Sequence, residues 1–313
     1  MNTPSNVVTD STHDPQVGAP APLSKTRPMY WSVRRELWEN RSIYVAPLVV
    51  TAFVLFASLI SMIGLPRRMR TLPALDPAQQ HLLVVKPFNM APAPIMFAAF
   101  LVGMFYSLDA LYGERRDRSI LFWKSLPVSD LTTVLSKASI PLVALPLIAF
   151  VLSVVTQAVM LLVSTAVLLG SGMSPAPLWT EFEFFLGPLV MLYGLTVHAL
   201  WFAPIYGWLM LVSVWARRTP VLWAALPLFA ISAVERIAFG TTHFASLLRY
   251  RVAGAMAEAF TVNPQGGGAG IIDQLSQLDP LRFLTSAGLW IGLAAAAFFF
   301  GTAIRLRRYG EPI

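Results

Sequence analysis

Asp109 and His198 are ionisable residues that lie inside long apolar stretches of this chain. An ionisable group inside a membrane span is costly and by default marks a path for a substrate or a proton. Plainer roles stay open for both residues. The Asp109 carboxylate could reach interfacial water or pair with Arg115 or Lys124, and a neutral His198 could bond to a hydroxyl or a backbone carbonyl. The sequence therefore offers these two residues as candidates for an intramembrane polar path.

A dense run of charged residues extends from Glu114 to Arg118 and is followed at once by the apolar residues Ile120, Leu121 and Trp123. The segment ends in L-P-V-S-D, and a Ser-Asp pair at this place is typical of the start of a new helix. We expect a short helix along the membrane surface. Its apolar side would fit a groove, and its charged end would offer groups for ion pairing.

No constellation of residues supports enzyme chemistry. The four histidines are not spaced as H-E-x-x-H and no G-x-S-x-G occurs, so neither a zinc protease nor a serine hydrolase is expected. The absence of cysteine excludes a thiolate metal site. The glycine-rich stretch GGGAG lacks the lysine of a phosphate-binding loop. We predict no catalytic residues, no bound metal and no ATPase activity in this chain.

Composition predicts an all-α membrane protein. Hydrophobic residues make up 56% of the 313 residues and charged residues only 12%, about half the charged share of a soluble domain. Six runs are long and apolar enough for helical spans. They lie near residues 43–64, 94–112, 140–169, 187–215, 220–240 and 281–304. We expect Pro146 to bend the third run and Pro204 to kink the fourth.

The distribution of basic residues predicts that both termini are cytoplasmic. Fifteen of the 23 Lys and Arg residues fall on one side of a six-span topology, and positive residues are typically retained in the cytoplasm. Residues 1–28 are polar and predict a disordered tail, and Tyr30–Ser42 predicts an amphipathic interfacial helix. Residues 241–278 predict an external connection with an amphipathic helix, followed by a flexible link at 263–270.

The segment ERRDRSILFWKSLPVS also resembles the cytoplasmic loop between the second and third spans of permease subunits in type-2 ABC transporters. The shared order is a Glu- and Arg-rich start, an aliphatic-aromatic centre, then L-P-V-S and a new helix. The wider layout from Tyr30 to Arg308 is also similar to that family. It has an amphipathic helix, six spans, and helical material outside between the fifth and sixth spans.

The resemblance implies a multi-pass permease subunit of an ATP-binding-cassette exporter in the bacterial inner membrane. Its partners would be membrane lipid, a second permease subunit (an identical chain or a paralogue) and ABC ATP-binding subunits. Those subunits would bind the ATP, so this chain would hold no cofactor. The role of coupling helix falls on Glu114, Arg115, Arg116, Arg118, Ile120, Leu121 and Trp123.

Two alternatives stay open at this stage. The charged segment is also compatible with an ordinary positive-inside loop that carries an interfacial Trp. The whole chain is compatible with an ATP-independent secondary transporter or channel, a class in which inverted repeats and broken helices are typical. The net charge of +7 does not point to nucleic acid, because the basic residues lie in short clusters between apolar runs. The chemistry of the substrate is not encoded in any motif.

Overall fold

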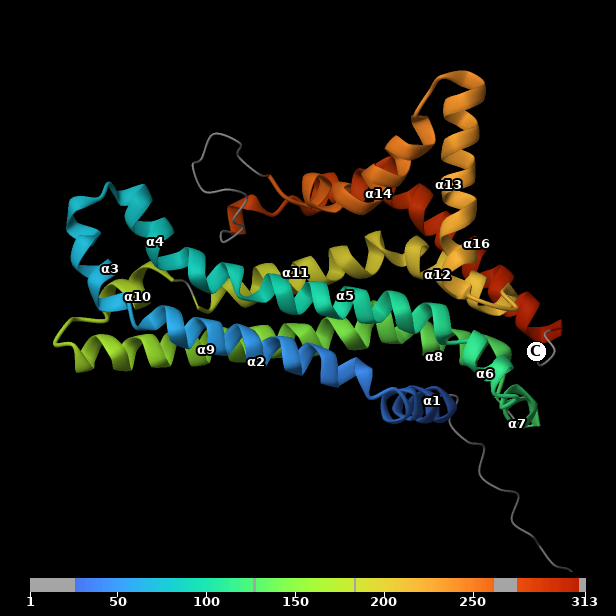
Figure 1. Ribbon diagram of the computed structural model, residues 1–313, viewed down its shortest axis with the longest axis horizontal. Coiled ribbons are helices and arrows are strands. Elements are labelled where there is room, and N and C mark those ends of the chain that lie inside the picture. Colours follow the sequence, from blue (N-terminus) through green and yellow to red (C-terminus); the bar gives the residue numbers. More distant parts are fainter. Residues whose placement is uncertain (1–25, 126–127, 183, 262–274, 310–313) are drawn as a thin grey trace, which may run out of the picture.

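The computed structural model describes residues 26–125, 128–182, 184–261 and 275–309 (Figure 1). Within these ranges the regular elements are helices, and the β-type pairing is one isolated bridge between Phe260 and Leu278. Six helical segments have the length and composition to cross a membrane. The chain is therefore an all-α, multi-pass membrane protein, as predicted. We expected a disordered tail at residues 1–28. Residues 1–25 lie outside the described residues, and helix α1 begins at Thr26.

Three long helices lie side by side and form the centre of an elongated bundle (Figure 1). They are α2 (Ser42–Met62), α5 (Pro92–Asp109) and α9 (Leu145–Gly170). Gly103 lets other parts of the chain approach α5 closely, because a Cβ atom at this position would lie 3.2 Å from both Pro141 and Tyr206. Packing at small residues is a general feature of helices in lipid, where no hydrophobic effect draws helices together.

The third apolar run is longer than predicted and contains an irregular turn. Helix α8 (Asp130–Ser139) continues through a π-helical turn (Ile140–Ala144) into α9. Pro141 lies inside this turn, and because proline has no N–H group, the regular hydrogen-bond ladder cannot pass it. Pro146, which we expected to bend the run, lies just after the turn.

The fourth apolar run is divided into two helices. Helix α11 (Leu186–Trp201) ends at Trp201, and α12 (Ala203–Trp215) begins two residues later, with Phe202 between them. Pro204 occupies the second position of α12, where a missing N–H group costs nothing. The expected kink therefore takes the form of a complete break one residue long.

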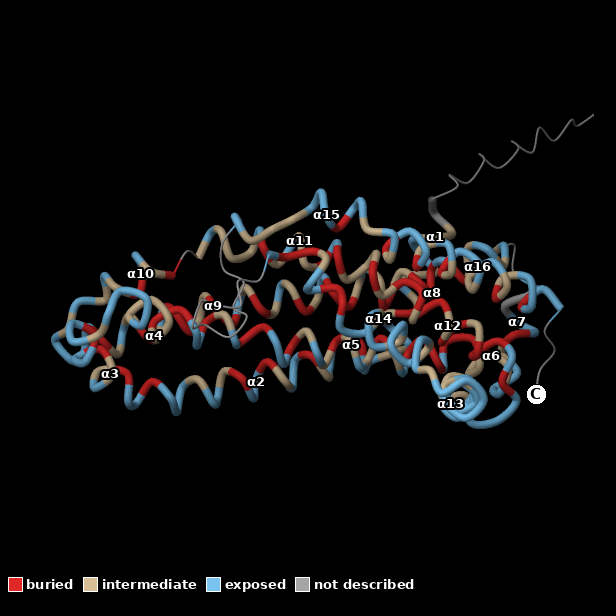
Figure 2. The backbone as a smooth tube through the Cα atoms, turned by 90° about the horizontal axis from the view of Figure 1, so that it is seen from above, coloured by how far each residue is buried: buried red, intermediate tan, exposed pale blue. Residues whose placement is uncertain are grey.

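Helix α13 (Pro220–Phe239) runs across the long axis of the bundle and is seen end-on in Figure 2. Ala224 is its single buried residue. Helix α14 (His243–Ala259) leads back towards α11, and α16 (Ala287–Tyr309) packs along α12. The predicted helix in 241–278 thus exists as α14, while the flexible link at 263–270 lies outside the described residues.

Shorter helices and turns connect the long helices. They are α1 (Thr26–Glu39), α3 (Leu65–Thr71), the 3₁₀ turn Leu72–Ala74, α4 (Pro77–Met90), α6 (Tyr112–Arg116), α7 (Ile120–Ser125), α10 (Ala176–Glu181), the 3₁₀ turn Leu275–Gln277 and α15 (Pro280–Thr285). Helices α1, α6, α7 and the last turns of α16 share one end, which we call the charged end. Helices α3, α4 and α10 lie at the opposite end (Figure 1).

Candidate functional site

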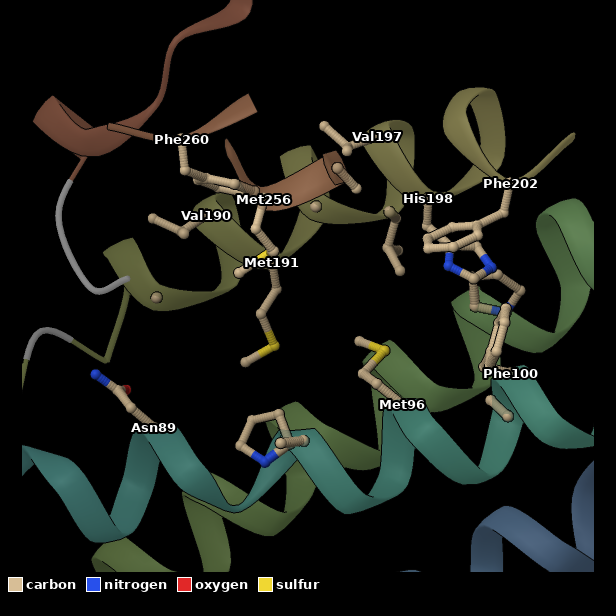
Figure 3. Close-up of a pocket in the computed structure, with 18 of the residues that line it drawn as sticks. Asn89, Met96, Phe100, Val190, Met191, Val197, His198, Phe202, Met256 and Phe260 are labelled. Atoms are coloured by element: carbon tan, nitrogen blue, oxygen red, sulfur yellow. The ribbon is translucent and has the colours of Figure 1, made fainter. Parts of the chain in front are cut away.

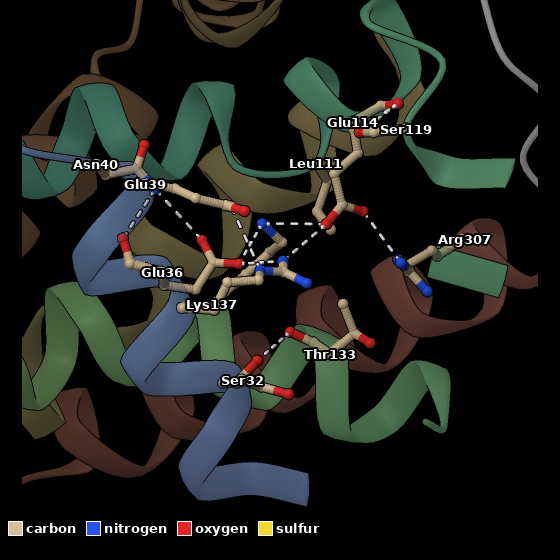
Figure 4. A network of polar contacts seen from close by, with 12 residues as sticks. Ser32, Glu36, Glu39, Asn40, Leu111, Glu114, Ser119, Thr133, Lys137 and Arg307 are labelled. Atoms are coloured by element: carbon tan, nitrogen blue, oxygen red, sulfur yellow. Dashed lines mark hydrogen bonds and ion pairs between the residues drawn. The ribbon is translucent and has the colours of Figure 1, made fainter. Parts of the chain in front are cut away.

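A buried cluster of ion pairs lies at the charged end (Figure 4). Lys137 of α8 places its Nζ atom 2.9 Å from Glu36 Oε1 and 3.2 Å from Glu114 Oε1. All three residues are buried, with Lys137 3% and Glu36 1% exposed. One ammonium group therefore joins the N-terminal helix α1 and the short helix α6 to the third apolar run.

The cluster continues to the last helix of the chain. Arg307 of α16 places Nη2 3.0 Å from Glu114 Oε2 and also pairs with Asp130 at the start of α8. Tyr106 of α5 donates its hydroxyl to Glu36 Oε2 over 2.8 Å, and Arg35 pairs with Glu36 at 2.7 Å. We call Arg35, Glu36, Tyr106, Glu114, Asp130, Lys137 and Arg307 the buried charge network.

The network balances the charges that it buries. Three basic and three acidic side chains alternate in it, so no charge is left without a partner of opposite sign. Burial alone would raise the pKa of Glu36, but the nearby Lys137, the Tyr106 hydroxyl and Arg35 outweigh burial and lower it. A buried pair contributes little over an apolar core, whereas breaking one costs several kcal/mol. The network therefore fixes the relative positions of α1, α5, α6, α8 and α16.

The predicted coupling segment forms two short helices, α6 and α7, and the first is firmly held. The backbone N–H groups of Leu111 and Tyr112 both donate to Ser213 Oγ, over 3.0 and 2.8 Å. Arg115 donates to the carbonyl groups of Val214 and Ala216 at the end of α12. Free carbonyl groups at a helix C-terminus attract cations. Glu114 and Arg115, expected to offer groups for pairing, are thus used within the chain.

The second half of the segment is exposed. Arg116 and Arg118 both lie on the surface, and Leu121 is 59% exposed. Ile120 is buried, and the Trp123 side chain lies outside the described part of the structure although its backbone belongs to α7. Arg118 adopts a φ of 57°, a left-handed conformation that costs a non-glycine residue about 1 kcal/mol. The turn between α6 and α7 is therefore held by its surroundings and not by its own preference.

Asp109 and His198 do not form one polar path. Asp109 is exposed at the charged end, 3.7 Å from Arg116. His198 lies between helices, where its Nε2 atom is 3.1 Å from the Tyr206 hydroxyl. Each residue lines a different hollow of the molecule. A hydroxyl partner for His198 was one of the alternatives, but this hydroxyl belongs to a tyrosine across the break between α11 and α12.

The hollow beside His198 is a cavity of about 390 Å³ between α5, α9, α11 and α14 (Figure 3). Asn89 lies at one end of it, and the rings of Phe100, His198 and Phe202 lie at the other. The side chains of Met96 and Met191 extend into the space between these ends. Gln157 of α9 also lines the cavity. The cavity is thus mainly apolar, with a few neutral polar groups.

One arginine holds α14 against the break in the fourth run. Arg251 donates to the carbonyl groups of Trp201 and Gly288, over 3.2 and 2.6 Å. Trp201 in turn donates its indole N–H to the Arg251 carbonyl over 2.7 Å, and the guanidinium lies 4.5 Å from its ring centroid. A Cβ atom at Gly292 would collide with this guanidinium. Leu247 and Met256 of the same helix remain half exposed.

The sequence interpretation missed the charge network and the cavity for different reasons. Glu36 and Lys137 were visible as charges, but their pairing depends on contacts between residues far apart in the chain. Asn89 and Gln157 were visible as polar residues near or within apolar runs, a signal that could have drawn attention to the cavity. Comparison with known protein families, with curated proteins and with solved structures finds no match to this chain.

Proposed function

We propose that this protein is the membrane-spanning permease subunit of an ATP-driven exporter, and that ATP is hydrolysed by a separate soluble subunit docked on α6 and α7. The observation that carries the proposal is the contrast within this helix pair. Its first half is bonded to the network and to α12, while its second half exposes Arg116, Arg118 and Leu121. The resemblance of ERRDRSILFWKSLPVS to the permease coupling loop supports the same assignment.

Force applied to α7 would reach several helices at once. Glu114 pairs with Lys137 of α8 and Arg307 of α16, and Arg115 bonds to the end of α12. A displacement of α6 therefore has to move these helices with it or break buried ion pairs, which is costly. A soluble motor at the charged end would use this rigidity to change the shape of the membrane part.

The surface around the helix pair is basic. Arg217 and Arg218 follow α12 and are exposed, as are Arg305 and Arg308 near the end of α16. An excess of basic residues is typical of the cytoplasmic face. The proposal therefore places the charged end in the cytoplasm of a bacterium and the opposite end outside. It also includes a second permease subunit, identical or homologous.

The first test is a charge reversal confined to exposed residues. We expect Arg116→Glu/Arg118→Glu to abolish copurification of a soluble ATPase that otherwise accompanies the tagged chain from native membranes in near-equal amount. Substrate-stimulated ATP hydrolysis should fall at least tenfold, because the reversed charges on the docking surface repel the partner. Arg115 is left intact because its contacts are internal.

The matched control is Arg67→Glu/Arg70→Glu, which makes the same charge change on exposed residues of α3 at the opposite end. This control should leave ATPase recovery and hydrolysis unchanged. An ATPase that stays bound to the Arg116/Arg118 variant, or is lost equally from both variants, contradicts the docking role.

An ATP-independent transporter is the second candidate, and the break between α11 and α12 favours it. Interrupted helices beside a central cavity are typical of ion-coupled transporters. The same purified chain in sealed vesicles distinguishes the two functions. Transport driven by a proton or sodium gradient, with no ATPase present, would support the second candidate and exclude the first.

A further inference from the structure

The cavity between α5, α9, α11 and α14 has two buried polar atoms without a protein partner. Gln157 is 1% exposed, and its Nε2 atom donates to the Phe88 carbonyl over 3.1 Å. This bond fixes the side-chain amide, but the other atom of the amide, Oε1, has no hydrogen-bond partner within the described chain. Asn89 Nδ2 is unpartnered in the same way. Buried polar groups are normally satisfied, so two such atoms on residues that line one cavity point to a ligand that satisfies them.

The polar atoms define what a ligand must offer. Gln157 Oε1 requires a hydrogen-bond donor, and Asn89 Nδ2 requires an acceptor. A hydroxyl or an amide supplies both, and it also suits either orientation of the two side-chain amides. A ligand group that only accepts, such as an ether or ester, satisfies one of them.

The lining excludes charged ligands. None of the described residues around the cavity is Asp, Glu, Lys or Arg, and its one readily titratable group, His198, is already bonded to Tyr206. A phosphate or carboxylate would be buried without a counter-charge, at a cost of several kcal/mol. This requirement distinguishes the occupant from a bilayer phospholipid, whose headgroup carries a phosphate.

The remaining walls fit an apolar body of variable shape. Met96, Met191 and Met256 line the middle of the cavity, and Phe100 and Phe202 close the end opposite Asn89 (Figure 3). Methionine is flexible and polarizable, and it is common where a surface has to accept different apolar partners. A volume of about 390 Å³ lies in the range of small-molecule pockets.

We propose that this cavity is a binding site for uncharged amphipathic molecules that carry a hydroxyl or amide on an apolar body. Binding itself does not depend on ATP coupling. The identification of such molecules as the exported cargo rests on the proposed function, so binding is measured on the purified chain without an ATPase. A failure to bind overturns the cavity inference alone, whereas a failure to recruit an ATPase overturns the proposed function alone.

The test uses a diazirine derivative of 1-dodecanol as a photoreactive probe, with the full chain in phospholipid nanodiscs. We expect saturable labelling that maps to cavity residues of α5, α9 and α11. Unmodified 1-dodecanol should compete for it, and dodecane and dodecanoate should compete at least tenfold more weakly. Labelling that is not saturable and is spread over lipid-facing positions would overturn the inference, as would equal competition by dodecanoate.

Variants on neighbouring residues of α11 provide the control. Met191→Trp fills the cavity and should lower saturable labelling at least tenfold, while Leu192→Trp adds the same ring to the exposed face and should leave it unchanged. Gln157→Met keeps the volume and should abolish the preference for dodecanol over dodecane. Size-exclusion chromatography shows whether Met191→Trp folds. If it does not fold, Gln157→Met still tests the inference.

A bilayer lipid is the competing occupant, and a diazirine phosphatidylcholine tests for it. Saturable labelling of the same residues by this phospholipid, sensitive to Met191→Trp, would overturn the assignment to uncharged ligands. Diffuse labelling that both tryptophan variants leave unchanged would support it.

Discussion

The buried charge network and the cavity between α5, α9, α11 and α14 both bury polar groups within the protein, but the two regions differ in how those groups are paired. In the network, Lys137 and Arg307 form ion pairs with Glu36, Glu114 and Asp130, so each charge has a partner of opposite sign even though Glu114 Oε1 and Arg307 Nε lack a hydrogen bond within the described chain. In the cavity, Gln157 Oε1 and Asn89 Nδ2 are neutral and have no partner in the described chain. The first arrangement fixes helices to one another, and the second leaves capacity for a molecule that is not part of the chain.

The difference follows from the cost of burying each kind of group. An unpaired charge in a low-dielectric interior is so costly that a fold retains buried charges only in mutually satisfied sets. An unpaired neutral amide costs far less, about 1–3 kcal/mol. A binding site can therefore tolerate one while it is empty. The neutral groups at the cavity are therefore consistent with a binding site that exists both with and without a ligand. The paired charges at the charged end are consistent with a permanent contact between helices.

The strongest test of this comparison is to remove Lys137, the cation at the centre of the network. Lys137→Met removes the ammonium group shared by Glu36 and Glu114, so the remaining ion-pair partners of these buried carboxylates are Arg35 and Arg307. We expect a loss of about 3–5 kcal/mol in the free energy of unfolding. The loss would be measured as a large drop in Tm by tryptophan fluorescence of the chain in detergent.

Two further variants show whether that loss comes from charge. Lys86→Met makes the same change at an exposed position of α4 and should leave Tm within error. Glu114→Gln added to Lys137→Met should recover part of the loss, because one of the two carboxylates that lost Lys137 is then neutral. Additive losses in the double variant would mean that the ion pairs do not couple these helices.

Acidification is a second test of the same network, with a smaller expected effect than that of Lys137→Met. The pKa of Glu36 is lowered from its ordinary value of 4.5, because Lys137, Tyr106 and Arg35 outweigh the effect of burial. A depressed pKa means that the unfolded state binds the proton more tightly. The stabilisation is therefore complete above about pH 5 and is lost as the pH falls towards the lowered pKa. We expect Tm to fall over this window by less than the Lys137→Met variant loses at neutral pH.

The carboxylate responsible can be identified on α1 itself. Glu36→Gln should flatten the fall of Tm on acidification, because the group that titrates is gone. Glu39 lies nearly one turn further along α1, with its side chain exposed. Glu39→Gln should therefore leave the dependence of Tm on pH unchanged. An equal slope in the wild type and in Glu36→Gln would assign the acid sensitivity to other carboxylates.

The same contrast explains which features the sequence could predict. Long apolar runs, Pro204 and the charged run after Asp109 are local signals. They predicted the helical fold, a kink near the observed break, and one short surface helix where the structure has the two helices α6 and α7. The role of Glu114 depends on Lys137 and on Arg307, which lies 193 residues away. No local pattern distinguishes that buried carboxylate from the exposed Asp117 three residues later. The cavity likewise requires four helices to be placed before its walls exist.

The smallest expected effect is the most informative for the cavity. Gln157→Met removes the bond from Nε2 to the Phe88 carbonyl, which is worth about 0.5–1.5 kcal/mol, but it also removes a buried acceptor whose lack of a partner costs about 1–3 kcal/mol. The two effects oppose each other, so we expect the free energy of unfolding to change by less than about 1 kcal/mol.

Thr156→Val on the same helix is the control, since the Thr156 hydroxyl is satisfied by the Leu152 carbonyl at 2.7 Å. A loss above about 2 kcal/mol on Gln157→Met, and not on Thr156→Val, would mean that Gln157 Oε1 is already satisfied inside the protein. The cavity would then be part of the packed core, and its contrast with the charge network would disappear.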